Sequence, residues 1–324
     1  MNDLATRLRQ LLDSEGLAHL VLYDRDTAKV VLDAATETPE DSSGFPQVSR
    51  AHERTGRQLY YILEELEPDF AELRTGALIR TVLRVPTGSV FYYFIEQGFH
   101  LYGATPAVDR LDELDLMMAE SVNELRTAVR YSPLDFGSFF SRPGAAVAAS
   151  LTGPPASSPV AEEEGDPEES EDTDETADTD ETAGYVSQKP AETTDASDIL
   201  QAALDVRGLH YVAYYRDPHT PFVADVFRHP ALEKFFRGPT PDQRRDKYGR
   251  MGQLLPGVVR RMNVSLHAIM RGELSQVVLD VEQGAVYFHA LPDRRFLVGV
   301  TLDQSMVAGA DRQMARLGRE LART

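Results

Sequence analysis

The chain repeats itself, and this repeat restricts its possible folds more than any other feature of the sequence. A constant shift, the one that carries Gly56 onto Gly252, aligns the two ends of the 324-residue chain without a gap over a long span. The other matches include three further glycine pairs and several apolar or acidic positions: Gly76 with Gly272, Gly88 with Gly284, Gly103 with Gly299, Val82-Leu83 with Val278-Leu279, and Asp115 with Asp311. Glycine is needed where a turn requires positive φ or where backbones approach closely. We therefore predict a tandem repeat of one domain.

The two copies are separated by a stretch that lacks the composition of a folded segment. Residues 144–197 carry fifteen acidic side chains, one basic side chain and few large apolar ones. Such a stretch cannot offset the entropy cost of ordering its backbone, and its like charges keep it extended. We predict two domains, at residues 1–131 and 198–324. A disordered linker over residues 132–197, first rich in Pro, Ala and Ser and then acidic, joins them.

The overall composition excludes several classes of protein. Much of the net charge of −19 lies in the linker, whereas residues 198–324 hold 18 basic and 14 acidic side chains. The absence of cysteine excludes disulfides, thiolate catalysis and cysteine-ligated metals. The chain opens with Met-Asn-Asp rather than a basic and then apolar segment, and it has no apolar run of membrane-spanning length. We therefore expect a cytoplasmic protein without a membrane partner.

The periodicity of apolar residues predicts the same order of elements in each copy. In the first copy, helices are expected at residues 2–15, 49–65 and 109–130, and strands at 18–23, 29–34, 77–85, 89–95 and 100–105. In the second, helices are expected at 198–206, from about 242, and at 306–321, with strands at 210–215, 222–227, 274–281, 285–291 and 296–301. Pro256 is expected to kink or interrupt the middle helix. The order is α-β-β-α-β-β-β-α, written twice.

This order resembles the roadblock/dynein-light-chain domain family. The resemblance is clearest over residues 274–321, where Glu282-Gln283-Gly284 ends a strand and Val286-Tyr287-Phe288 begins the next. Phe296-Leu297-Val298-Gly299-Val300 follows, and Gly309-Ala310-Asp311-Arg312 lies in the final helix. In the first copy the best points are Gly88 and residues 101–105. The resemblance implies an α+β domain with a five-stranded antiparallel sheet, the first and last helices on one face and the middle helix on the other.

The resemblance also implies that two such domains pair through the middle helix and the edge of the third strand. An independent argument agrees, because residues 77–85 and 274–281 would form long apolar sheet edges that need another strand to cover them. The two copies could pair within one chain, giving a ten-stranded sheet, or each could pair with a second chain in a dimer. Pro256 and Gly257 stand where the first copy has Tyr60 and Tyr61, so the two pairing faces are not expected to be equivalent.

No motif for catalysis or for a cofactor emerges. The segment Gly249-Arg250-Met251-Gly252 is too short for a phosphate-binding loop and lacks its Lys-Ser/Thr, and the histidines never form a pair at helical ligand spacing. The alternating acids Asp172, Asp174, Asp178 and Asp180 lack the glycine turn and terminal glutamate of a calcium loop. We therefore predict no catalytic residue, no metal and no cofactor.

Candidate partner-binding residues cluster on the two middle helices. They are Arg54, Arg57, Tyr60, Tyr61 and Glu64 in the first copy, and Arg244, Arg245, Lys247, Arg250, Arg260 and Arg261 in the second. Exposed tyrosine and arginine often anchor interfaces, although one of the two tyrosines could equally belong to the core. The basic cluster is either a solvated helix face or a patch for an acidic surface. Nucleic acid is not expected, because the chain is acidic and no aromatic residues interleave the cluster.

Prokaryotic proteins similar to this domain act on small Ras-like GTPases, as scaffolds or as activators of GTP hydrolysis. The repeat, the strand edges and the missing catalytic motifs favour a non-enzymatic interaction module of this kind, with no arginine finger assigned. Two other hypotheses remain open. One is a pair of small-ligand sensor domains of the GAF or PAS type, and the other is a purely structural dimerisation scaffold.

Overall fold

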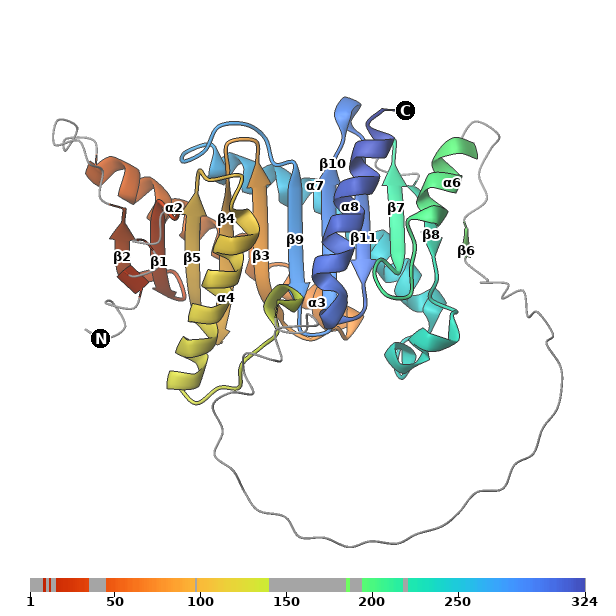
Figure 1. Ribbon diagram of the computed structural model, residues 1–324, viewed down its shortest axis with the longest axis horizontal. Helices are drawn as coiled ribbons and strands as arrows, with labels where there is room; N and C mark the ends of the chain where they lie inside the picture. The colour runs from red at the N-terminus through yellow and green to blue at the C-terminus, as the bar shows by residue number, and fades with distance from the viewer. Residues whose placement is uncertain are drawn as a thin grey trace, which may run out of the picture.

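The chain forms an α+β structure built on one large antiparallel sheet (Figure 1). The computed structural model describes residues 8, 9, 12, 16–34, 45–96, 98–139, 185–186, 194–217 and 221–323. Most of the predicted first helix and most of the predicted linker lie outside the described residues. Leu8 and Leu12 of that helix are buried.

Eleven strands form this single sheet in the order β2-β1-β5-β4-β3-β9-β10-β11-β7-β8-β6. The strands are β1 (His19–Asp24), β2 (Thr27–Asp33), β3 (Leu78–Val85), β4 (Gly88–Glu96), β5 (Phe99–Thr105), β6 (Tyr185–Val186), β7 (Tyr211–Tyr215), β8 (Pro221–Asp225), β9 (Gln276–Val281), β10 (Gly284–Ala290) and β11 (Phe296–Thr301). The expectation of a five-stranded sheet in each domain is corrected here. Because β3 pairs with β9, the strands of both halves belong to one sheet, and the exposed edges expected at these two strands are covered within the chain.

The register of the central strand pair places the two halves around a pseudo-two-fold axis. Val82 lies opposite Val278, the residue onto which the sequence shift carries it. The pairing of β4 with β3 and β5 recurs residue for residue in the pairing of β10 with β9 and β11. The first strands of the two halves are also equivalent, because His19 on β1 lies opposite Ala104 and Tyr211 on β7 lies opposite Val300, the residue that matches Ala104. The shift in residue number from β1 to β7 is four residues shorter than the shift that aligns the other strands.

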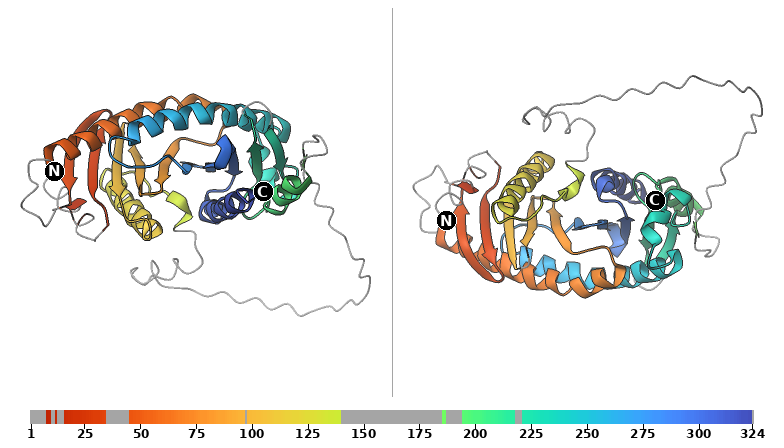
Figure 2. Two further views of the ribbon diagram at one scale, coloured as in Figure 1. Left: turned by 90° about the horizontal axis from the view of Figure 1, so that it is seen from above. Right: turned by 90° about the horizontal axis from the view of Figure 1, so that it is seen from below.

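Helices cover both faces of the sheet (Figure 2). One face carries α2 (Phe45–Glu64), α3 (Glu67–Leu73) and α7 (Pro241–Leu266), and the other carries α4 (Leu111–Ala128), α6 (Thr194–Ala202) and α8 (Val307–Leu321). In the part of the chain that the structure describes, four short 3-10 helices lie between these elements: η2 (Phe136–Ser138), η3 (Pro230–Phe236), η4 (Pro292–Arg294) and η5 (Gln304–Met306). Each helical layer buries its own hydrophobic core against the sheet, which gives three layers.

One matched pair of glycines shows why the repeat is detectable in the sequence. Gly56 on α2 and Gly252 on α7 face the hydroxyl groups of Tyr23 and Tyr215, and a Cβ atom at either position would overlap that hydroxyl. The Tyr23 hydroxyl donates to the carbonyl oxygen of Glu53 at 2.8 Å, and the Tyr215 hydroxyl donates at 3.4 Å to that of Gly249, the matching position. Close approach of a tyrosine from the sheet to the helix therefore requires glycine in both halves.

The middle helices differ between the halves. α2 ends at Glu64 and is followed by α3, whereas α7 runs without a break from Pro241 to Leu266. The interruption expected at Pro256 does not occur, and the proline lies inside the helix. A capping box at Thr240 and Gln243, with a proline in the first turn, fixes the start of α7.

Part of the segment predicted as linker is packed against the fold. Phe136 of η2 is fully buried, and Ser138 and Phe139 are also buried. Farther along, β6 pairs with β8. The folded part of the first half therefore extends past the predicted boundary at residue 131, because Phe136 and Phe139 are buried between α4 and α8.

Candidate functional site

The predicted partner-binding residues lie on α2 and α7, which run side by side over one face of the sheet (Figure 2). We call the outer surface of these two helices the α2–α7 face. Thr55 on α2 donates through its hydroxyl to the carbonyl oxygen of Ser265 on α7 at 3.0 Å. Glu65 and Arg261, which occupy matching positions in the two halves, form an ion pair at 2.5 Å. The two helices thus present one continuous surface.

In the first half, most of the predicted residues reach this surface. Arg54, Arg57, Tyr61 and Glu64 are exposed. Arg57 donates through Nε to the carbonyl oxygen of Asp26 at 2.9 Å, and the Tyr61 hydroxyl donates to a carboxylate oxygen of the same aspartate at 2.9 Å. The hydrogen bond from Tyr61 lowers the pKa of Asp26. The turn between β1 and β2 therefore holds Arg57 and Tyr61 in place on the face.

Tyr60, by contrast, belongs to the core. Its ring stacks on that of His100 with centroids 4.9 Å apart, and its hydroxyl donates to Glu64 at 2.9 Å at the helix surface. His100 also stacks on Tyr23 and Tyr92. Burial among these rings lowers the pKa of His100 to about 3, so it is neutral at physiological pH. Of the two candidate tyrosines, only Tyr61 is available to a partner.

In the second half, the two arginines at the start of α7 are used inside the fold. Arg244 is buried, with its guanidinium 5.4 Å from the centroid of the Phe236 ring. Arg245 pairs at 2.5 Å with Asp225, which is fully buried at the end of β8, and lies over the ring of Tyr185. Arg245 thus fastens α7 to the edge of the sheet, Arg244 packs against η3, and the two side chains present little charge to solvent.

The remaining basic residues of α7 are partly neutralised by the first half. Lys247 donates to the carbonyl oxygen of Glu72, and Arg250 pairs with the Glu72 carboxylate at 3.3 Å. Arg260 is exposed on the outer side of α7, next to the Arg261 of the pair with Glu65. The sequence cluster is therefore divided in space, and the structure does not gather it into one basic patch.

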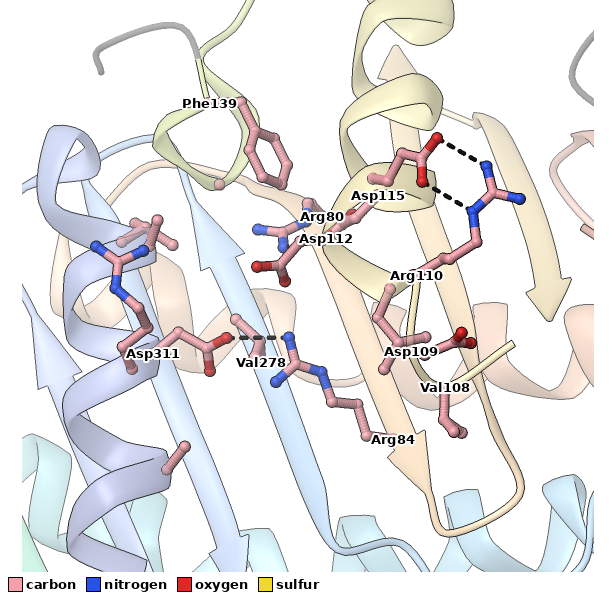
Figure 3. Close-up of a pocket in the computed structure, with 17 residues that line it drawn as sticks. Arg80, Arg84, Val108, Asp109, Arg110, Asp112, Asp115, Phe139, Val278 and Asp311 are labelled. Atoms are coloured by element: carbon pink, nitrogen blue, oxygen red, sulfur yellow. Dashed lines mark hydrogen bonds and ion pairs between the residues drawn. The ribbon is translucent and has the colours of Figure 1, made fainter. Parts of the chain in front are cut away.

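Sequence reasoning missed a second site, on the opposite face of the sheet, where the pseudo-two-fold axis passes between β3 and β9. A cleft of about 500 Å³ lies there between α4 and α8 (Figure 3). Arg80 and Arg84 of β3 lie in it, and Asp109 and Asp112 from the start of α4 line its rim together with Arg312 of α8. The two arginines belong to two sets of interacting side chains related by the pseudo-symmetry.

The first set, axis site 1, consists of Arg80, Asp115 and Asp280. Arg80 donates through Nε to Asp115 of α4 at 3.1 Å and through Nη1 to Asp280 of β9 at 2.9 Å. The Tyr93 hydroxyl donates to the carbonyl oxygen of Asp115 at 2.8 Å, and the Gly137 amide donates to Asp280 at 2.8 Å. All three charged residues are buried. Segment η2 therefore closes this site.

The second set, axis site 2, consists of Arg84, Gln276 and Asp311, the last of which matches Asp115 under the repeat. Arg84 donates to Gln276 of β9 at 2.9 Å and to Asp311 of α8 at 3.0 Å, as Figure 3 shows for the aspartate. Gln276 donates in turn to Asp311 at 2.5 Å. Arg84 and Asp311 are each 19% exposed, so this site opens to the cleft.

Electrostatics distinguish axis site 1 from a solvated ion pair. Burial raises the pKa of Asp280 to about 6, against the opposing effects of Arg80 and the Gly137 amide. Burial alone would lower the pKa of Arg80, but Asp115, Tyr93 and Asp280 together raise it well above its usual value. Arg80 is thus held as a cation among acceptors. A signal for these sites was present in the sequence, because the shift places Arg84 on Asp280 and Asp115 on Asp311.

Within the described part of the chain, no group of three or more His, Asp or Glu side chains is placed to hold a metal ion. None of the described helices is both long and apolar enough to cross a membrane. In comparisons with known proteins, no family model matches the chain, and no curated protein matches it by sequence.

Proposed function

We propose that this chain is a non-enzymatic protein-interaction module made of two roadblock/dynein-light-chain-like domains that pair within one chain. The strand order and register of the two halves, related through Val82 and Val278, support this proposal most strongly. A middle helix on one face and a terminal helix on the other fit the same domain plan. In this proposal the acidic linker connects the two copies.

The partner we propose is a small Ras-like GTPase, and the α2–α7 face is its binding surface. This face exposes Arg54, Tyr61 and Arg260 together with two apolar side chains of α7, Leu254 and Val264, which are 51% and 73% exposed. Arginine and tyrosine beside exposed apolar side chains are typical of the centres of protein interfaces. The halves differ in charge here, since Glu64 stands where the second half has Arg260, so the face is not symmetric in charge.

We assign this chain the role of a regulator or scaffold, with no catalytic residue and no cofactor. An arginine finger must reach freely into a partner's active site. Arg244 is buried beneath Phe236, and Arg245 is held by Asp225, so neither side chain is free to do so. In this proposal, any stimulation of GTP hydrolysis comes from repositioning the GTPase's own residues.

Binding to immobilised protein tests this function. Ras-like GTPases loaded with GDP or with a non-hydrolysable GTP analogue are passed over the full chain, and their hydrolysis rates are measured with and without it. We expect at least one GTPase to be retained in one nucleotide state. The variant Tyr61→Ala/Arg260→Glu should reduce that retention tenfold or more, on the order of 1.4 kcal/mol. The control Arg323→Glu, at the far end of α8, should not. If no GTPase is retained and no rate changes, the proposal fails.

One observation favours a second candidate, a small-ligand sensor. The cleft on the pseudo-two-fold axis brings together charged side chains from both halves, and convergent polar groups in a cleft can fix the orientation of a small ligand. A thermal-shift screen with metabolites separates the two functions. A ligand that raises the melting temperature, with the effect abolished in Arg84→Gln, would favour the sensor, whereas retention of a GTPase without any such ligand would favour the interaction module.

A further inference from the structure

The β3–β9 register places residues of the two axis sites opposite one another. Arg80 lies opposite Asp280, and Arg84 lies opposite Gln276, with Val82 opposite Val278 midway between them. All of these side chains except Arg84 are buried, and Arg84 is half-buried. Charges in such a place need a counter-charge, because water does not compensate them. Each axis site of the native pair satisfies this requirement with one arginine and at least one aspartate.

We propose that these buried charges make the first half pair only with a second half, and prevent either half from pairing with a copy of itself. The two halves have the same strand order, and β3 and β9 occupy equivalent places in it, so β3 could in principle pair with β3 of another chain in the same geometry. Position 84 matches position 280, and position 80 matches position 276. In a β3–β3 pair, Arg80 of each chain would therefore lie opposite Arg84 of the other.

Pairing of two first halves would place two arginines at each axis site beside one aspartate, Asp115. Pairing of two second halves would do the reverse. Gln276 would lie opposite Asp280, beside Asp311, so that each site would hold two carboxylates and no cation. Like charges opposite one another across a strand pair are destabilising, more so when they are buried. Only the pairing of β3 with β9 gives every site one arginine.

The edge of β3 can thus pair only with a strand edge that carries particular side chains. The partner edge that it fits carries aspartate opposite Arg80 and an uncharged hydrogen-bonding side chain opposite Arg84. It must also carry a helix aspartate, the equivalent of Asp311, that reaches Arg84. The second half of this chain has all three features. A second half from another copy of the chain would have them as well, whereas a first half from another copy would not.

An exchange of residues between the halves inverts this preference. In the double variant Arg84→Asp/Asp280→Arg, the composition is unchanged. The native β3–β9 pair would hold two arginines at axis site 1 and two aspartates without an arginine at axis site 2. A pair of two first halves would instead reproduce axis site 1 twice, and a pair of two second halves would reproduce axis site 2 twice. The matched control exchanges the uncharged residues at another pair of equivalent positions, as Thr81→Val/Val277→Thr.

Disulfide trapping reads out the partner directly, because the chain has no cysteine of its own. Position 82 lies opposite position 278 in the native pair and would lie opposite itself in a pair of two first halves. Residues directly opposite on antiparallel strands are within disulfide distance. The single variant Val82→Cys therefore cross-links two chains only when first halves pair with each other, and Val82→Cys/Val278→Cys closes a disulfide within one chain only when β3 pairs with β9.

We expect Val82→Cys to remain monomeric on a non-reducing gel in the otherwise native chain and in the Thr81→Val/Val277→Thr control. In the Arg84→Asp/Asp280→Arg chain it should form disulfide-linked dimers on the order of tenfold more abundant. Equal cross-linking in all three proteins would overturn the proposal. It would also be overturned if the exchanged chain stayed monomeric and still closed the internal disulfide of Val82→Cys/Val278→Cys.

A second variant keeps the test decisive if the exchanged chain fails to fold. Asp280→Asn removes one buried charge, leaves the side-chain size unchanged and creates no like-charge contact. It should lower the melting temperature of the full chain by more than about 5 °C, because Arg80 loses one of its two counter-ions. A melting temperature equal to that of the native chain would show that the charge pair does not stabilise the β3–β9 contact, and the proposal would fall.

Discussion

Beneath its middle helix, the first half of the sheet buries histidines where the second half buries aromatic rings. His19 on β1 corresponds by register to Tyr211 on β7, and the sequence shift carries His100 onto Phe296. The same shift carries His52 on α2 onto Tyr248 on α7. Strand register and the helix glycines are nonetheless the same in both halves. Backbone geometry is thus set by register and close contacts, while rings of similar size but different polarity can occupy the layer between sheet and helix.

The largest effects should come from positions at which the halves agree. Met118 on α4 and Met314 on α8 are matched, fully buried, and face the matched glycines Gly103 and Gly299. Met118→Ala and Met314→Ala should each lower the free energy of unfolding by about 2–5 kcal/mol, because each leaves a cavity in the same place. Urea unfolding measures both. Leu254→Ala, on the exposed side of α7, should change it by less than about 0.5 kcal/mol. A large loss in only one of the two methionine variants would break the equivalence of the halves.

The next largest effect should be a loss of folding stability at low pH, caused by the buried histidines of the first half. Burial lowers the pKa of His52 to about 4 and that of His100 to about 3, whereas both titrate near 6.5 in the unfolded chain. Stability is therefore complete above pH 6.5 and is lost as the pH falls toward these folded values, by about 2 kcal/mol for each histidine at pH 5. Urea unfolding at pH 7.5 and at pH 5 measures the loss.

Variants that exchange histidine and phenylalanine between matching positions of the two halves test this prediction more directly. His100→Phe should reduce the acid-induced loss at pH 5 by about 2 kcal/mol, and Phe296→His should increase the loss. The lowered pKa values of His19, His210 and His289 are common to all the proteins compared. Around His100 lie Tyr23, Tyr60 and Tyr92, with Asp24 nearby. His52 stacks on His19, which pairs with Asp33, and contacts the Tyr102 hydroxyl at 3.0 Å. The raised pKa of Asp280 acts in the opposite sense but is common to all the proteins compared. An unchanged loss in His100→Phe would contradict the assignment.

A smaller effect should follow from a difference between the middle helices in backbone hydrogen bonding. Pro256 inside α7 lacks the amide that would donate to the carbonyl oxygen of Gly252, whereas the matching Tyr60 of α2 has its amide. Pro256→Ala should raise the free energy of unfolding by about 1–2 kcal/mol. Thermal unfolding checks this, with Gln253→Ala on the exposed side of the same helix as the control. A lower stability in Pro256→Ala would mean that the proline fills a packing role in this half.

The smallest effect is expected where the halves differ in exposed charge. Glu65 and Arg261 occupy matching positions with opposite signs and pair across the α2–α7 face, with side chains 57% and 48% exposed. Glu65→Gln should cost less than about 0.5 kcal/mol at physiological salt, because solvent screens the pair. Urea unfolding at low and high salt measures it. A cost above about 1 kcal/mol that disappears at high salt would show that this pair helps to hold the two helices together.

Much of the fold was predictable from local pattern. The strand predicted at residues 296–301 coincides with β11, and most other strand boundaries differ by one or two residues. The candidate site was predictable only in part. The partner surface on the middle helices stays a prediction, and of the residues named for it Tyr60 and Arg244 are buried and Arg245 pairs internally. Helix periodicity shows which residues share a face, while burial of a charged residue depends on an element far away in sequence, as Asp225 and Phe236 show for these two arginines.

The amino-acid sequence by itself determined the repeat, its register and the positions of the strands, because glycines at close contacts and alternating apolar residues act over short distances along the chain. Only the tertiary structure decided that β3 pairs with β9 of the same chain, that Phe136 packs beyond the predicted boundary, and that Arg80, Asp115 and Asp280 meet at the axis. These contacts join residues from distant parts of the chain. Their stability comes from burying apolar rings, while the pairing of opposite charges offsets the cost of removing those charges from water. Both depend on residues that no single stretch of sequence brings together.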